Sequence, residues 1–506
     1  MRFLASCVPA LILLVLLTSC GEGTTKNTAD DRPNVLFIFT DDQTYTSLHA
    51  LGNDEIETPN LDRLVANGTT FTHAYNMGGW NGAICVASRA MINTGRSVWR
   101  AKEIRDRWDS GDTTGYAQAW GPLLASAGYA TYMSGKWHVT APADHLFETV
   151  RHIRPGMPPD GFNHGAVQAL FNRHDRQPPR DSVVALLPPG YNRPLSTNDD
   201  SYDPADPKHG GFWTGGKHWS EVLADDGEAF LAQAAKDQRP FFMYLAFNAP
   251  HDPKQAPPEY LARYTPGELA VPASFQPLYP NKEKMGNSTD LRDEALAPFP
   301  RTELAVRQHK AEYYALITHL DAQIGRILDA LDATGKADNT LVMFTADHGL
   351  SMGRHGLLGK QNLYDHSVRV PLVISGPGIP KGAKNDADVY LQDVMPTALD
   401  AAGIDKPGYV EFNSLLPLVG KAKDSGLNAV YGAYVNWQRS IRKEGWKLLV
   451  YPQVPEIKLF DLNADPEEMN NLAEAEPERV ETMFAELLDL QESMGDTLQM
   501  RLADYR

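Results

Sequence analysis

Cys85 and the residues that follow it have the types and spacing that most directly indicate chemistry in this chain. The chain has three cysteines in 506 residues, and Cys85 is the only one beyond the first twenty residues. Ser88 and Arg89 follow it in a segment whose pattern predicts a turn running into a helix. A thiol placed there would feel the positive end of the helix and a nearby guanidinium, which suits chemistry on an anion. The alternative is a small, buried cysteine with a packing role.

Four short apolar runs indicate the elements that would position the other polar residues. The runs cover residues 35–40, 130–133, 241–247 and 341–345, and they alternate with amphipathic helical stretches. This alternation is typical of an α/β fold, in which ligands bind outside the carboxyl ends of the strands. We therefore expect the polar residues after the four runs to form one site with Cys85. These residues are Asp41, Asp42, Lys136, His138, His251, Asp347 and His348.

The acidic residues after the first and fourth runs are candidate metal ligands. Asp41, Asp42 and Asp347 offer carboxylate oxygens, which favour calcium or magnesium over zinc. An ordinary turn or a helix N-cap would explain either group alone. Like charges crowded at one sheet edge repel each other unless a cation lies between them, which favours a metal site.

Composition limits the classes of protein to which the chain can belong. It is 42% apolar and 22% charged, so it can bury a large core and is not disordered. Its formal net charge of −17 argues against a nucleic acid partner. An anionic substrate would have to be attracted by local basic groups, because the field of the whole chain repels it.

The first 32 residues predict export. Arg2 precedes an apolar run at residues 11–17, and Thr18, Ser19 and Cys20 then form a cleavage zone. The run is too short to span a bilayer as a helix. Its end resembles a bacterial lipobox, which implies a signal peptide at residues 1–20, a lipid on Cys20 and a flexible tether at residues 21–32. The alternative is plain cleavage near Ser19, with Cys20 incidental.

Several segments together resemble the formylglycine-dependent type I sulfatases of the alkaline-phosphatase-like superfamily. Residues 85–95 are similar to the signature around the modified cysteine, and residues 128–138 match the second sulfatase signature. Asn248 to Pro253 looks like the family's P-H-x-P element, and residues 347–360 resemble its D-H-G…K segment. The Asp347-His348 pair, in place of Asp-Asn, is similar to the iduronate-type carbohydrate sulfatases.

The resemblance implies a fold and a division of the chain. It implies a three-layer α/β/α sandwich at residues 33–410 and a smaller α+β domain at residues 411–506. Within the second part, residues 430–451 predict paired strands and residues 469–502 a closing helix.

The resemblance also implies roles for the site residues. A formylglycine-generating enzyme would oxidise Cys85 to formylglycine, whose hydrate Arg89 and the metal would hold. Lys136 and Lys360 would bind sulfate oxygens, His138 would act on the second hydroxyl and His251 would protonate the leaving oxygen. Two points stay open: whether His251 or Lys360 is the acid, and whether His348 ligates the metal or orients another ligand. The metal is expected to be one calcium ion bound by Asp41, Asp42, Asp347, His348 and the modified Cys85.

The substrate is the least defined part of the prediction. Export on a lipid anchor, to the periplasm or cell surface, favours a sulfated glycan or oligosaccharide. The alternatives are a small sulfate ester such as choline sulfate, a phosphate diester or phosphonate monoester, and a glycan-binding lipoprotein without catalysis. A group of aromatic and basic residues could stack on a sugar or simply pack inside the protein. These residues are Trp80, Trp213, Lys217, His218 and Trp219.

Overall fold

The four predicted strands lie side by side in the middle of a mixed nine-stranded sheet, counted over the residues that the structure describes. The computed structural model describes residues 31–175, 177–423 and 425–505. The predicted signal peptide, Cys20 and nearly all of the predicted tether lie outside these residues. Residues 32–506 form one compact unit, so the predicted domain boundary at residue 410 stays a prediction.

The order of the strands brings their carboxyl ends to one edge. It runs β10-β2-β11-β9-β1-β8-β4-β5, with β12 paired to β2. The neighbours β9, β1, β8 and β4 are all parallel. The polar residues that follow these four strands therefore meet at one end of the sheet, as predicted. The strands are β1 (Asn34–Thr40), β2 (Gly68–Tyr75), β4 (Ala130–Lys136), β5 (Thr149–Arg154), β8 (Phe241–Ala246), β9 (Thr340–Ala346), β10 (Arg369–Val370), β11 (Leu372–Ser375) and β12 (Ala383–Tyr390).

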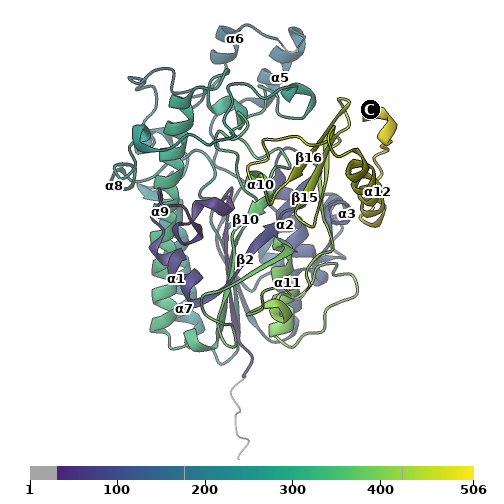
Figure 1. Cartoon of the computed structure of the whole chain (residues 1–506). Coiled ribbons are helices and arrows are strands. Elements are labelled where there is room, and N and C mark those ends of the chain that lie inside the picture. The colour runs from purple at the N-terminus through teal and green to yellow at the C-terminus, as the bar shows by residue number, and fades with distance from the viewer. Residues whose placement is uncertain (1–30, 176, 424, 506) are drawn as a thin grey trace, which may run out of the picture. The chain divides into compact units, whose positions relative to one another are not determined.

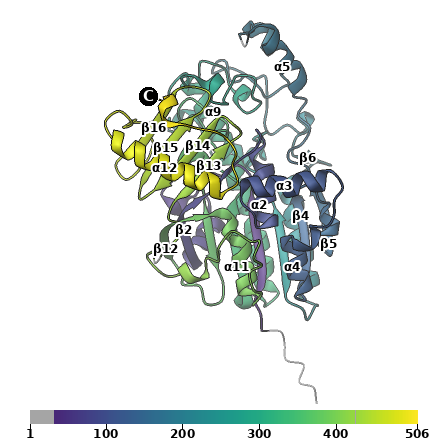
Figure 2. The ribbon, with the colours of Figure 1, turned by 90° about the vertical axis from the view of Figure 1, so that its right-hand side faces the viewer.

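Helices cover both faces of the sheet, because successive residues of each buried strand point to opposite faces. From β1, Leu36 and Ile38 pack with α1 (Pro59–Asn67), α7 (Trp219–Ala234) and α9 (Glu303–Ala333). Val35 and Phe37 point the other way and pack with α4 (Trp120–Ser126) and α11 (Val394–Ala401). Figures 1 and 2 show these two helical layers on either side of the strands. The predicted three-layer α/β/α sandwich is confirmed.

Four strands of the C-terminal region form a second sheet, and its fifth strand comes from the segment before Cys85. Its order is β16-β15-β14-β13-β3, and α12 (Pro477–Ser493) packs against it (Figure 2). The predicted paired strands and closing helix are confirmed. Gly78 in β3 has φ +84°, and a Cβ there would lie 2.0 Å from the carbonyl oxygen of Ala433, so the two backbones pack without room for a side chain. The strands are β3 (Gly78–Gly79), β13 (Val430–Tyr434), β14 (Gln438–Lys443), β15 (Trp446–Tyr451) and β16 (Glu456–Asp461).

The remaining helices and short strands belong mostly to the segments that connect the sheet strands near its carboxyl edge. They include α2 (Ile84–Thr94), α3 (Val98–Asp109), α5 (His164–Arg173), α6 (Arg180–Val184), α8 (Pro258–Leu261), α10 (Asp365–Val368), β6 (Trp213–Thr214) and β7 (Lys217–His218). Within the described ranges, no helix is both long and apolar enough to cross a membrane.

Candidate active site

All of the predicted site residues gather at the carboxyl edge of the sheet. Asp41 and Asp42 directly follow β1, and Lys136 is the last residue of β4. Asp347 and His348 directly follow β9, whereas His251 and Lys360 lie in loops after β8 and β9. Cys85 lies in α2, at the same edge of the sheet. Except for the partly exposed His138, these side chains are buried.

Arg89 joins the cysteine helix to two of the strands. It lies one turn after Cys85 in α2, every residue of which is buried. Its Nε and Nη2 each lie 3.0 Å from Oδ2 of Asp347, and Nη1 donates to the carbonyl oxygen of Lys136 at 2.8 Å. Arg89 is 0% exposed, so these protein contacts take the place of water around its guanidinium. The helix that carries Cys85 is thereby held against the ends of β4 and β9.

Two lysines neutralise the carboxylates that follow β1. Lys136 Nζ forms an ion pair with Oδ2 of Asp41. Lys360 Nζ donates to both oxygens of Asp42, at 2.9 and 3.0 Å. Although burial would lower it, Asp42 and Asp293 raise the pKa of Lys360 well above its usual value. Three carboxylates and three cationic side chains thus balance each other inside the protein, and the third pair is Arg89 with Asp347.

The carboxylate of Asp41 has the unsatisfied hydrogen-bonding capacity that is expected of a metal ligand. Oδ1 of Asp41 is buried and has no hydrogen-bond partner among the described residues. Burial, followed by the charge of Asp347, raises the pKa of Asp41 well above its usual value. Ligand atoms of Asp41, Cys85, Asp347 and His348 all lie within 4.8 Å of one another. Two carboxylates, an imidazole and a thiol so close together fit a divalent cation.

His348 also faces the carboxylates with a nitrogen suited to a metal. Its Nδ1 lies 2.9 Å from the carbonyl oxygen of Gly349, so this nitrogen carries the hydrogen and donates it. Its Nε2 lies 3.0 Å from Oδ1 of Asp42 and 3.6 Å from Oδ1 of Asp347. Burial would lower the pKa of His348, but the two aspartates raise it above its usual value. Only a proton or a cation makes such an approach of Nε2 to two carboxylates favourable.

Cys85 lies in a strongly cationic environment. Its Sγ is 3.3 Å from Nδ1 of His138. Burial would raise the pKa of the thiol, but Lys136, His138 and Lys360 lower it well below its usual value. Such a site stabilises negative charge at the position of Sγ.

The loops that present Asp42 and His138 have strained backbones. Asp42 has φ +65° and His138 has φ +53°, in the left-handed region that non-glycine residues rarely adopt. The hydroxyl of Tyr313, from α9, donates to the carbonyl oxygen of Asp42 at 2.6 Å and braces that turn. Gly156 lies against the ring of His138, where an added Cβ would approach within 2.2 Å. Strain that the surrounding structure maintains is common at functional sites.

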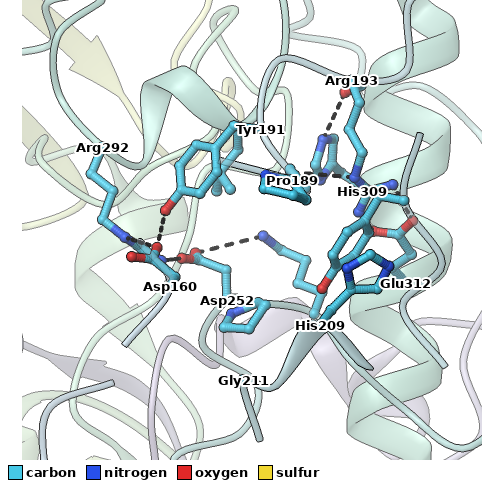
Figure 3. Close-up of a pocket in the computed structure, with 15 residues that line it drawn as sticks. Asp160, Pro189, Tyr191, Arg193, His209, Gly211, Asp252, Arg292, His309 and Glu312 are labelled. Carbon is cyan, nitrogen blue, oxygen red and sulfur yellow. Dashed lines mark hydrogen bonds and ion pairs between the residues drawn. The ribbon is translucent and has the colours of Figure 1, made fainter. Parts of the chain in front are cut away.

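His251 is oriented by the residue that follows it. Its Nδ1 donates to the carbonyl oxygen of Asp252 at 2.6 Å, which leaves Nε2 3.7 Å from Oδ2 of Asp42. Burial lowers the pKa of His251 below its usual value, although Asp42 opposes that shift. Next to His251, Asp252 lines a cavity that sequence reasoning did not identify (Figure 3).

The predicted aromatic and basic loop residues have mainly packing roles. Trp80, His218 and Trp219 are buried, so the packing alternative holds for them. His218 accepts a hydrogen bond from the backbone of Ser220 and caps α7. Lys217 forms an ion pair with Asp225 of the same helix.

Comparison with known proteins shows to which family the chain belongs. The sulfatase family model matches residues 33–404, and a second model, described as N-sulphoglucosamine sulphohydrolase, C-terminal, matches residues 353–493. The chain therefore belongs to the sulfatase family and is a sulfuric ester hydrolase. Sulfatases in general work with a formylglycine and a divalent metal.

Curated relatives agree with this assignment, and solved structures share the fold. An arylsulfatase of Clostridium perfringens is 31% identical, with 88% of this chain and 91% of that protein covered. An N-acetylglucosamine-6-O-sulfatase of Bacteroides thetaiotaomicron is 27% identical, with 92% and 87% covered. A structure solved in complex with its substrate, D-glucosamine-2-N,6-O-disulfate, superposes with a TM-score of 0.68 at 24% identity, covering 92% of this chain and 99% of that one. A phosphonate monoester hydrolase of Agrobacterium radiobacter gives 0.66 at 22% identity, with 92% and 96% covered.

We expect Arg89→Met to lower the free energy of unfolding by about 3 to 5 kcal/mol, because it leaves Asp347 buried without its partner. Arg63→Met is the matched control: Arg63 pairs with Asp329 at 2.8 Å on the surface, and the loss there should be roughly 0 to 1 kcal/mol. Denaturant unfolding of both variants measures the difference. Equal losses in the two variants would contradict the role given to Arg89.

Proposed function

We propose that this sulfatase removes sulfate from a sulfated glycan or oligosaccharide, with Cys85 as the precursor of its nucleophile. The observation that carries the proposal is the position of Cys85 beside Lys136, His138 and Lys360 in a buried, charge-balanced site. Relatives whose names include N-acetylglucosamine-6-O-sulfatase and ulvan-active sulfatase support a carbohydrate substrate.

The fixed cations of the site would bind the sulfate group. Lys136 and Lys360 present ammonium groups in a dry environment, where an attraction to the sulfate oxygens is stronger than in water. Arg89 is a positioning residue, because its guanidinium contacts Asp347 and the carbonyl oxygen of Lys136. Preorganised charges of this kind stabilise the negative charge that develops as the ester bond breaks.

Oxidation of Cys85 to formylglycine would supply a hydrate with one hydroxyl that attacks sulfur and a second that, once deprotonated, expels sulfate and regenerates the aldehyde. The formylglycine-generating enzyme is the partner that this modification requires. His138, whose Nδ1 lies 3.3 Å from Sγ, is positioned to accept the proton of the second hydroxyl as a general base.

His251 is the acid that we propose for the leaving oxygen. Since its Nδ1 hydrogen is donated to Asp252, the ring presents Nε2 to the site and would deliver a proton from that atom. Lys360 is the alternative, but both oxygens of Asp42 already hold its ammonium group.

We propose calcium as the metal, held by Asp41, Asp42, Asp347 and His348 together with an oxygen of the modified Cys85. The ion would offset the three carboxylates and attract the sulfate group. The partnerless Oδ1 of Asp41 and the approach of His348 Nε2 to two carboxylates support this ligand set.

Elemental analysis of the purified protein tests the metal proposal. We expect one calcium ion per chain and its loss in Asp41→Asn, because that variant removes a charged ligand from the cluster. Chelation should also lower the melting temperature of the native protein, since it removes a ligand that binds the folded state and not the unfolded chain. Two zinc ions per chain would instead indicate a phosphatase-type site.

Export and anchoring complete the proposal. The lipobox-like residues before Cys20 support a lipid-anchored protein in the periplasm or at the cell surface. Cys20→Ser should release the protein from the membrane fraction after export, and a variant that stays membrane-bound would exclude the lipid anchor.

A panel of substrates tests the function itself. We expect the fully modified protein to release sulfate from at least one defined sulfated mono- or oligosaccharide, with a higher kcat/KM than for choline sulfate, phosphate diesters or phosphonate monoesters. The phosphonate substrates belong in the panel because the phosphonate monoester hydrolase shares the fold. Preference for a phosphonate or phosphate ester would overturn the proposal, and glycan binding without sulfate release would indicate a lectin-like role.

A two-substrate comparison separates the two candidate acids. His251→Ala should lower kcat/KM for a sugar sulfate by about 100-fold or more and that for 4-nitrophenyl sulfate much less, because nitrophenolate departs without a proton. His138→Ala is the internal reference and should slow both substrates. Equal losses on both substrates in His251→Ala would transfer the acid role to Lys360.

A further inference from the structure

A cavity opens next to the site and is lined by Asp252, the residue that follows His251 (Figure 3). The space between its lining residues is about 490 Å³, open solvent at its mouth included. Asp252 lines it and also lies 3.7 Å from Nδ1 of His251. Since His251 faces the leaving oxygen in the proposed mechanism, the cavity lies where the remainder of the substrate would extend.

The wall of this cavity is unusually rich in charge for a buried surface. Three basic and three acidic side chains line it, together with Tyr191 and Tyr202, which add aromatic surface. The charged residues are Asp160, Arg193, Asp252, Lys254, Arg292 and Glu312. Buried charges are costly unless they are paired, so the pairing of each one indicates which are available to a ligand.

Both arginines are committed to carboxylates. Nη1 of Arg193 donates to Glu312 at 2.6 Å, and Nη2 contacts the second oxygen of the same carboxylate. Nε of Arg292 donates to Asp160 at 3.0 Å, and its Nη2 forms an ion pair with Asp252. Figure 3 shows these pairs on opposite sides of the cavity. Neither guanidinium is free to bind a ligand without breaking an internal pair.

Lys254 differs from the arginines. Its side chain is 3% exposed, yet its nearest carboxylate oxygen, Oδ1 of Asp252, lies 3.8 Å from Nζ, beyond hydrogen-bond length. The charge of Asp252 is already shared with Arg292 and His251. An ammonium group has three hydrogens to donate, and the nearest carboxylate accepts none of them at hydrogen-bond distance. Of the lysines and arginines in the wall, Lys254 is the one that a ligand can use.

We propose that Lys254 binds a second anionic group, a sulfate or a carboxylate, on the sugar that carries the sulfate to be removed. This inference rests on the proposed carbohydrate substrate and adds a specificity-determining residue to it. An anionic oxygen satisfies the ammonium group more fully than a hydroxyl does, because Lys254 lacks a carboxylate at bonding distance. The enzyme would then favour substrates with at least two negative groups.

The test compares pairs of substrates that share the reacting sulfate and differ by one anionic group. One such pair is D-glucosamine-2-N,6-O-disulfate and N-acetylglucosamine 6-sulfate; a second pair adds a uronic acid carboxylate to an accepted sugar. In the wild type we expect a lower KM for the more anionic member of an accepted pair. Lys254→Met should raise that KM by roughly 10- to 100-fold and leave the less anionic member and 4-nitrophenyl sulfate nearly unchanged.

Three controls make the outcome decisive. Lys208→Met removes a neighbouring surface lysine, whose side chain is 68% exposed and pairs with Asp206, and should leave both KM values unchanged. Lys254→Arg should retain the preference for the more anionic sugar. Should Lys254→Met fail to fold, as judged by its melting temperature, Lys254→Gln keeps the polarity of the position without the charge and should lose the same preference.

The experiment distinguishes failure of the role proposed for Lys254 from failure of the proposed function. Equal changes of KM for both members of a pair, or a wild type that prefers the singly charged sugar, would overturn the role of Lys254 and leave the carbohydrate sulfatase intact. A wild type that hydrolyses aryl sulfates but no sulfated saccharide would overturn the proposed function and this inference with it. A loss confined to the carboxylate pair or to the sulfate pair identifies which anion Lys254 binds.

Discussion

The structure depends on the balance of charge at the carboxyl edge of its central sheet. Three buried aspartates at the ends of β1 and β9 would repel one another if they stood alone. Arg89, Lys136 and Lys360 offset them, and each of these cations comes from a different element. In the folded protein α2, β4 and the loop after β9 each supply the partner of one buried carboxylate. The same three ion pairs form the site and join these parts of the domain.

This constraint also explains why the cysteine depends on distant parts of the chain. Cys85 lies in the first turn of α2; Arg89, in the middle of the helix, binds Asp347, and β3 lies next to α2 in the segment before Cys85. Because β3 pairs with β13, the C-terminal sheet fixes the segment that leads into the helix. Gly78 permits that pairing, since its backbone lies against the carbonyl oxygen of Ala433. The C-terminal region thus contributes to the site by positioning the segment before Cys85.

Much of the catalytic edge could be predicted from sequence, and the cavity beside it could not. The strands that carry Asp41, Lys136 and Asp347 are continuous apolar runs, and parallel strands bring their ends together by geometry. The cavity is lined by loop residues such as Asp160, Arg193 and Arg292, which come from segments far apart in the chain and share no periodicity. Lys254 lies three residues after His251, but only its burial and its missing partner distinguish it from a surface lysine. The tryptophan-containing segment from Trp213 to Trp219 was open to two interpretations because exposure cannot be read from residue type.

The central claim is that the buried, charge-balanced site uses a modified Cys85 as its nucleophile. Peptide mass spectrometry of the Cys85 peptide tests it most directly, on protein produced with its formylglycine-generating enzyme and shown to release sulfate. The account predicts an aldehyde at Cys85, in proportion to the specific activity of each preparation. A fully active preparation in which Cys85 is entirely an unmodified thiol would contradict it.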